Sequence, residues 1–297
     1  MLKNRYYVTE IFDIVKFLSS NELSFRGDDE SFSVSSSETC PSFGLFLRLF
    51  EFTLVRDTRL QEEMKYILEV ATYELPEIQN EVLEIMATTV CENIADKCRR
   101  SDIRFYCIKV DGTEGHSGYE MISTVLQFVY EGKVEEHLLG IVESENMQAV
   151  ALCDVILNGL EIAGLDPRYI ISQCYDGASV MAGVRGGVQA LMQERVKKIY
   201  TSFWRASILK NNGHFMTLHF IFPNAYKIAA TVFTIAYETY EASFSTCSRI
   251  LIPFWRSVSK NRMRNLVLLP FERKLLLNMP DDNFLKRFKA MKNRRLQ

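Results

Sequence analysis

Three acidic side chains could together hold the metal ions that cut or join a phosphodiester. Asp111 and Asp176 each end a β-rich stretch and precede a glycine, and Glu241 lies in a long stretch with helical spacing. Carboxylates that lie close together repel one another unless a cation compensates their charge. Two Mg²⁺ ions would supply this compensation and would activate water for attack on phosphorus. If the three acids converge, they are catalytic and metal-binding residues, with Mg²⁺ as the cofactor.

Each acid also has an ordinary structural interpretation. Asp-Gly is a strong turn signal, and aspartate commonly caps helices. Taken singly, Asp111 and Asp176 are explained by turns, and Glu241 by a solvated helix face. The functional interpretation therefore depends on elements that bring the three positions together.

The middle of the chain alternates between segments typical of strands and of helices. Strand-like segments lie at residues 103–110, 121–130, 135–142, 168–174 and 215–222, and helix-like segments at residues 147–163, 179–199 and 225–250. Three strands that can form a meander, followed by alternating helices and strands, predict an α/β fold with an RNase H-like mixed sheet. In that sheet the first and fourth strands are neighbours and the last helix packs over their edge, so Asp111, Asp176 and Glu241 would converge.

Composition and spacing divide the rest of the chain. Residues 1–100 read as a helical region, residues 101–236 as the sheet core, and residues 237–297 as a C-terminal segment that is basic beyond residue 260. The apolar fraction of 47% and the charged fraction of 24% are typical of a globular protein. A net charge of -2 means that any basic surface must be local.

Cysteine and hydropathy patterns exclude several classes of protein. The seven cysteines form no Cys-x-x-Cys pair, and no histidine lies at zinc-finger spacing, so we expect reduced thiols and no structural zinc. The N-terminal residues do not open a signal peptide. Residues 211–237 are mostly uncharged, but Pro223 and Lys227 interrupt them. They fit a strand and a helix better than a membrane span, so we predict no membrane contact.

Six segments together resemble one family. They read FLSSNELSFRG (residues 17–27), PEIQNEVLEIM (76–86), FYCIKVD (105–111), LGIVE (139–143), QCYDGASVMAG (173–183) and EASFST (241–246). This series resembles the hAT transposases and the proteins derived from them. The resemblance implies that Asp111, Asp176 and Glu241 occupy the family's DDE positions. It also implies that residues 237–297 correspond to the hAT dimerisation region.

The sequence also departs from the hAT pattern. The family has a Cys-x-x-His element and a long helical insertion after its second aspartate, and residues 197–236 contain neither. The sequence GTEG at residues 112–115 replaces the family's ETTD, and no zinc finger precedes residue 16. We therefore expect an internally shortened, transposase-derived chain.

Two functional hypotheses follow. In the first, the chain is a domesticated or degenerate relative that has lost transposition and acts by dimerising with itself or another hAT-type protein, with DNA as a further partner. The alternative is an active Mg²⁺-dependent DDE nuclease or strand-transferase on DNA, which the missing insertion disfavours because positioned DNA supplies much of the catalysis. Whether the chain is an enzyme at all is thus left undecided by the sequence. A chain that cannot close its sheet over residues 200–227 would be a third case.

The C-terminal segment carries the predicted contacts. Its apolar residues would form the dimer interface or, equally well, close the chain's own core; they are Leu251, Ile252, Phe254, Trp255, Val258, Leu266, Leu268 and Leu269. The basic end, residues 284–297, fits a nuclear localisation patch or phosphate contact, or a solvated terminal helix. The resemblance implies nuclear residence; without it, the cytoplasm is expected.

Overall fold

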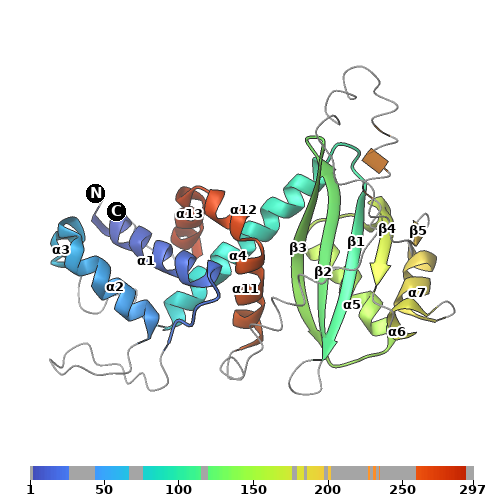
Figure 1. Ribbon diagram of the computed structural model, residues 1–297, viewed down its shortest axis with the longest axis horizontal. Coiled ribbons are helices and arrows are strands. Elements are labelled where there is room, and N and C mark those ends of the chain that lie inside the picture. The colour runs from blue at the N-terminus through green and yellow to red at the C-terminus, as the bar shows by residue number, and fades with distance from the viewer. Residues whose placement is uncertain are drawn as a thin grey trace. The chain divides into compact units, whose positions relative to one another are not determined.

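The structure of the chain is a computed structural model that describes residues 3–26, 44–66, 76–114, 120–175, 179–183, 186–196, 200–201, 227, 230–231, 234 and 259–291. The chain divides into two compact units. The first, here called the helical unit, joins Met1–Val90 to Asn261–Gln297, and the second, the sheet unit, is Cys91–Lys260. Figure 1 shows the elements of both.

Short helices and one long helix make up the helical unit. They are α1 (Lys3–Ser20), α2 (Leu45–Arg56), α3 (Thr58–Met64), the first part of α4 (Pro76–Arg99), α11 (Lys260–Phe271, from its second residue), α12 (Arg273–Asn278) and α13 (Asp281–Met291). Asp57 caps α3, because its carboxylate accepts from the backbone N–H groups of Arg59 and Leu60 at 2.9 and 3.1 Å. Pro76 begins α4, where the missing N–H of proline costs nothing.

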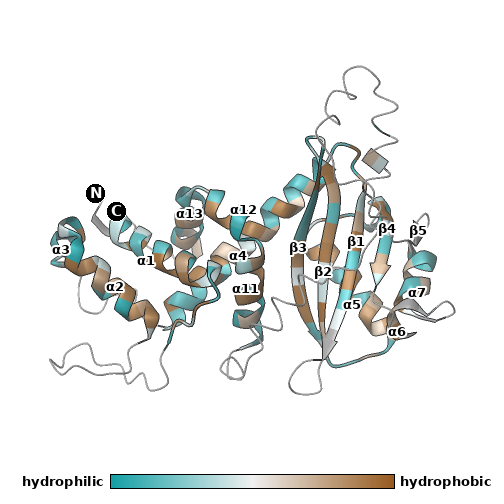
Figure 2. Cartoon of the chain, in the orientation of Figure 1, coloured by the Kyte–Doolittle hydropathy of each residue, from teal (hydrophilic) through white to brown (hydrophobic). Residues whose placement is uncertain are grey.

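Aromatic packing joins the two ends of the chain within the helical unit. The ring of Phe12 on α1 stacks on Phe284 with centroids 6.2 Å apart and meets Phe288 edge-on at 5.5 Å. Lys16 on α1 forms an ion pair with Asp281 on α13. Apolar residues are visible on α1, α2 and α11 in Figure 2. The C-terminal helices therefore complete a core to which α1 contributes Tyr7 and Phe12.

Among the described residues, five strands form the mixed sheet of the sheet unit. They are β1 (Tyr106–Glu114), β2 (Glu120–Tyr130), β3 (Lys133–Ser144), β4 (Ile170–Tyr175) and β5 (Tyr200–Thr201), in the spatial order β3-β2-β1-β4-β5. β1 to β3 are an antiparallel meander, while β4 is parallel to β1 and to β5. The predicted α/β class and RNase H-like strand order are confirmed, and the meander lies beside the parallel strands in Figure 1.

A tight turn connects β2 to β3 and fixes their register. Glu131 and Gly132 both have positive φ, 50° and 68°, as a two-residue hairpin turn requires. The carboxylate of Asp102 accepts from both of their backbone N–H groups, at 3.1 and 2.8 Å. A loop residue before β1 thereby holds the β2–β3 turn, which lies at the end of the sheet where β1 begins.

The helices of the sheet unit differ in one place from the prediction. Between β3 and β5 the described helices are α5 (Ala149–Ile162), the 3-10 turn η2 (Pro167–Tyr169), α6 (Ser179–Ala182) and α7 (Val188–Arg195). The single helix predicted over residues 179–199 is wrong, because α6 and α7 are separated at Gly183 and Gly187. A Cβ on Gly187 would lie 2.4 Å from the backbone nitrogen of Gly183. This close approach needs glycine and breaks the helix.

The last predicted elements are described only in part. The strand predicted at residues 215–222 lies outside the described residues and stays a prediction. The described strand β5, Tyr200–Thr201, pairs with β4. Residues 227, 230, 231 and 234 of the predicted last helix are helical. Thr234 accepts a hydrogen bond from the side chain of Gln127 at 3.5 Å, and Ala230 packs against Val129. Among the described residues, no helix has the length and apolar character to cross a membrane.

Candidate functional site

Asp111 lies within a strand rather than at its end. It is half-buried in β1 opposite Ser123 of β2, whose hydroxyl donates to the Asp111 carbonyl at 3.3 Å. The ladder continues to the pairing of Glu114 with Glu120. The interpretation of Asp111 as a strand end or turn is therefore wrong, because pairing with β2 keeps the Asp-Gly sequence extended.

The register of β1 and β4 pairs the residues that precede Asp111 and Asp176. Val110 is paired with Tyr175 in the parallel ladder. These residues immediately precede Asp111 and Asp176 in the sequence. The prediction that the first and fourth strands are neighbours is confirmed. Asp176 and Glu241 lie outside the described residues, so convergence of the three acids stays a prediction.

A buried lysine shares the sheet face of Asp111. Lys109 lies two residues earlier on β1, so both side chains project from the same face. Lys109 is only 6% exposed, and its ammonium group donates to the carboxylate of Glu136 on β3. An unpaired buried charge would be costly, so Glu136 makes this lysine tolerable.

This ion pair was not predicted from the sequence. A charged residue inside the apolar stretch YCIKV was the available signal, because a buried lysine requires a partner. The partner could not be named from sequence, since Glu136 lies on a strand that is not adjacent to β1.

Cysteine thiols line the same face beside the ion pair. Cys107 and Cys174 are buried against each other on β1 and β4. Burial raises the pKa of Cys174; Asp111 raises it further, whereas Lys109 lowers it. Both charged groups therefore act on this thiol, which stays protonated at neutral pH and is a poor nucleophile.

Of the three predicted Mg²⁺ ligands, the structure describes Asp111. Asp111 supplies an oxygen ligand of the type that Mg²⁺ prefers. No group of three potential metal ligands occurs among the described residues, to which Asp176 and Glu241 do not belong. The donor set therefore fits in chemical type at Asp111, and the other two ligands remain predictions.

The strand order and the comparison with known proteins agree. A three-stranded meander with a parallel fourth strand defines the class of RNase H-like proteins. The family model described as ZMYM1/FAM200, RNase-like domain, matches residues 1–187, more than half of the chain. The chain belongs to this family, which is hAT-related and transposase-derived.

Proposed function

We propose that the chain is a domesticated hAT-type protein that has lost transposition and acts by associating with itself or another hAT-type protein. Membership of a transposase-derived family supports the origin. The observation that carries the proposal is the helical unit, in which residues from both ends of the chain form one core. Such a unit can present a surface to a partner without any reaction in the sheet unit.

Ion pairs and aromatic contacts hold this unit together. Besides the packing of Phe12 against Phe284 and Phe288, Arg5 on α1 pairs with Asp282 on α13. These contacts join α1 to α13 at several points along its length. A surface formed by the two helices is therefore preorganised, which lowers the entropic cost of binding a partner.

The proposed interface uses side chains other than those predicted from sequence. Leu266, Leu268 and Leu269 are buried within the chain's own fold. The other five predicted interface residues lie outside the described residues. Large apolar side chains that remain exposed on α1, α12 and α13 are Phe17 (52%), Leu277 (49%) and Met291 (48%). These are the residues that we assign to the partner contact.

Sedimentation velocity over a range of concentrations tests self-association. We expect a dimer that dissociates on dilution and that is weakened by the double substitution Phe17→Ser and Leu277→Ser. The matched control is Phe52→Ser on α2, which removes an equally exposed aromatic ring from another helix. A chain that stays monomeric at every concentration contradicts self-association, and equal weakening by the control contradicts this surface.

Nucleic acid is the second proposed partner. We also propose that the chain resides in the nucleus. On α13 the acidic residues Asp281 and Asp282 are paired with Lys16 and Arg5. Lys286 and Lys289 of the same helix are exposed. The outward charge of α13 is therefore positive, which supports salt-sensitive contact with phosphates. Loss of duplex binding in Lys286→Gln/Lys289→Gln, measured by fluorescence anisotropy at low and high salt, is the expected result.

A second candidate function is a Mg²⁺-dependent nuclease. The pairing of Val110 with Tyr175 favours it, because the next residue of each strand is a predicted ligand. Calorimetric titration with Mg²⁺ and Mn²⁺ tests it. Binding that disappears in Asp111→Asn/Asp176→Asn, together with DNA cleavage by the unsubstituted chain, would replace the proposal of a non-catalytic protein.

A further inference from the structure

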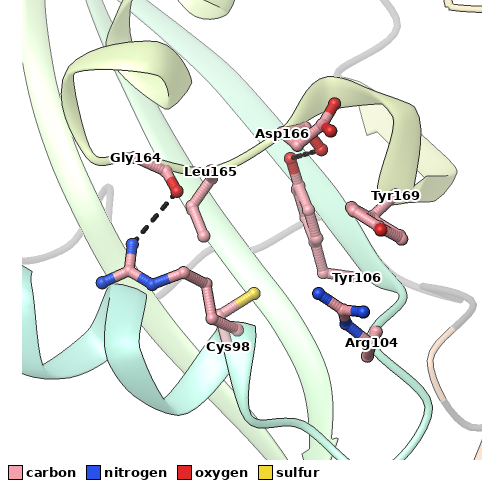
Figure 3. A pocket seen from close by; sticks show the side chains of 8 residues that line it. Cys98, Arg104, Tyr106, Gly164, Leu165, Asp166 and Tyr169 are labelled. Atoms are coloured by element: carbon pink, nitrogen blue, oxygen red, sulfur yellow. Dashed lines mark hydrogen bonds between the residues drawn. The ribbon is translucent and has the colours of Figure 1, made fainter.

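A pocket lies at the end of the sheet where β1 and β4 begin. Its volume is about 240 Å³. The lining residues, shown in Figure 3, come from the end of α4, the start of β1 and the segment between α5 and β4; they are Cys98, Arg99, Arg104, Tyr106, Gly164, Leu165, Asp166 and Tyr169. All belong to the sheet unit. Asp111 lies five residues beyond the start of β1, so the pocket is separate from the predicted acidic site.

Hydrogen bonds fix the walls of the pocket. The guanidinium group of Arg99 donates to the carbonyls of Ala163 and Gly164 at 3.0 and 3.1 Å. The hydroxyl of Tyr106 donates to the carbonyl of Asp166 at 3.1 Å. Gly164 has a φ of 69°, which favours glycine and lets its carbonyl face Arg99. The pocket is therefore formed before any ligand arrives.

The charge of the lining is positive. The lining contains Arg99, Arg104 and Asp166. Arg99 is already paired with Asp96, so Arg104 supplies the excess positive charge. The carboxylate of Asp166 accepts from the side chain of Arg168 at 2.7 Å, and this hydrogen bond lowers its pKa. Because Arg168 is paired with the Asp166 carboxylate, this carboxylate repels a bound anion less strongly. Burial raises the pKa of Cys98 to about 12, so its thiol adds no charge.

Arg104 is the cation available to a ligand. Its guanidinium group lies 5.2 Å from the ring centroid of Tyr169, and among the described residues it has no hydrogen bond or ion pair through that group. Its φ is 60°, in the left-handed region that non-glycine residues seldom adopt. A strained backbone that holds an exposed arginine at a pocket is a pattern found at binding sites.

An exposed aromatic ring adjoins this arginine. Phe105 is 38% exposed, and its ring lies 6.2 Å from that of Tyr169. Arginine and aromatic side chains together bind nucleotides in many proteins, the arginine through phosphate and the ring by stacking on a base. The volume is below the roughly 300 Å³ of a typical ligand pocket, so a base would lie outside it.

We propose that this pocket binds the phosphate group of a nucleotide, with Arg104 donating to the phosphate and Phe105 stacking on the base. The nucleotide is either free or part of a single strand. The single-stranded source rests on the nucleic-acid association proposed above, whereas the free source does not. A free nucleotide and a single strand would both present a phosphate to Arg104 and a base to Phe105.

Isothermal titration calorimetry of the full chain tests this site with three probes: inorganic phosphate, thymidine monophosphate and single-stranded oligothymidylate. Arg104→Gln should weaken binding about tenfold, the effect of losing a charge-assisted hydrogen bond. The matched control is Arg100→Gln, which removes an exposed arginine near the pocket that does not line it. Phe105→Ala should weaken binding of the nucleotide but not of inorganic phosphate.

The three probes distinguish a free nucleotide from a single strand, and the variants show whether binding depends on this pocket. Arg104-dependent binding of thymidine monophosphate supports a free nucleotide, and Arg104-dependent binding of oligothymidylate alone supports a strand. Binding of none of the probes, or equal weakening by Arg100→Gln, overturns the proposal. Arg104→Gly separates loss of binding from loss of folding. Glycine readily adopts the positive φ at this position, so this variant should stay folded while it loses binding. The lysine variants of α13 report on the proposed duplex contact separately.

Discussion

Lys109 of β1 reaches across the intervening strand β2 to Glu136 of β3, so a buried cation is neutralised on the sheet face that carries Asp111. Two strands that share no backbone ladder are therefore joined by their side chains.

Removing Glu136 from this pair should destabilise the fold more than removing Lys109. Glu136→Gln removes the carboxylate from a buried lysine and should destabilise the chain by about 3 kcal/mol. Lys109→Met should cost less, because methionine fills the space and Glu136 is 31% exposed. Urea unfolding of both single variants and the double variant measures this coupling. Additive effects of the two substitutions would mean that the pair contributes no interaction energy.

Glu135 should make stability depend on pH in the acidic range. Burial raises the pKa of Glu135, but hydrogen bonds from His137 and Lys97 outweigh it, so the pKa lies below its ordinary value of 4.5. A lowered pKa in the folded state stabilises the fold above the ordinary pKa, and this contribution is lost as pH falls through the folded-state value. The stability difference between the unsubstituted chain and Glu135→Gln should therefore shrink in acid. A difference that persists unchanged would exclude this linkage.

Asp13 should show the opposite sign. Burial and the nearby carboxylate of Asp281 raise its pKa, although Lys16 opposes them. Ionised Asp13 thus disfavours the folded state at neutral pH, and this cost disappears as pH falls below the ordinary value of 3.8. Asp13→Asn should raise the melting temperature at neutral pH and have no effect in acid. A lower melting temperature at neutral pH would show that its 3.9 Å contact with Lys16 dominates.

Arg262 should act in folding rather than in phosphate binding. It is buried, donates to the side chain of Asn80, and lies 5.2 Å from the ring centroid of Phe25. Arg262→Met should cost about 1–2 kcal/mol. Arg264→Met, on the exposed side of the same helix, should change stability by less than about 0.5 kcal/mol. Thermal unfolding of the two variants gives the comparison, and equal melting temperatures would contradict the structural role.

Local patterns were sufficient to predict the strand order but not every boundary. The apolar alternation of β1 to β3 and the helix before β4 are local signals, so the meander and the parallel strand were predicted correctly. Asp111 was placed at a strand end because Asp-Gly favours turns, whereas pairing with β2 extends the strand to Glu114. The break between α6 and α7 depends on the approach of Gly187 to Gly183, which helical spacing does not reveal.

Contacts between residues far apart in the sequence could not be predicted from local sequence patterns. The pairing of Lys109 with Glu136 and the packing of Phe12 on Phe284 join segments whose proximity depends on the whole fold. The pocket around Arg104 depends on the φ of one loop residue and on where Tyr169 lies. The acidic site was predicted from strand order and from the hAT resemblance, and of its three residues only Asp111 lies among those described.

The discontinuity of the helical unit has a consequence for biosynthesis. Phe12 leaves the ribosome long before Phe284 and Phe288 have been translated, an interval on the order of tens of seconds at ordinary elongation rates. All residues of the sheet unit are synthesised within that interval, so its folding can finish first. The apolar face of α1 meanwhile lacks its C-terminal partners, which makes the nascent N-terminal helices natural clients for a chaperone.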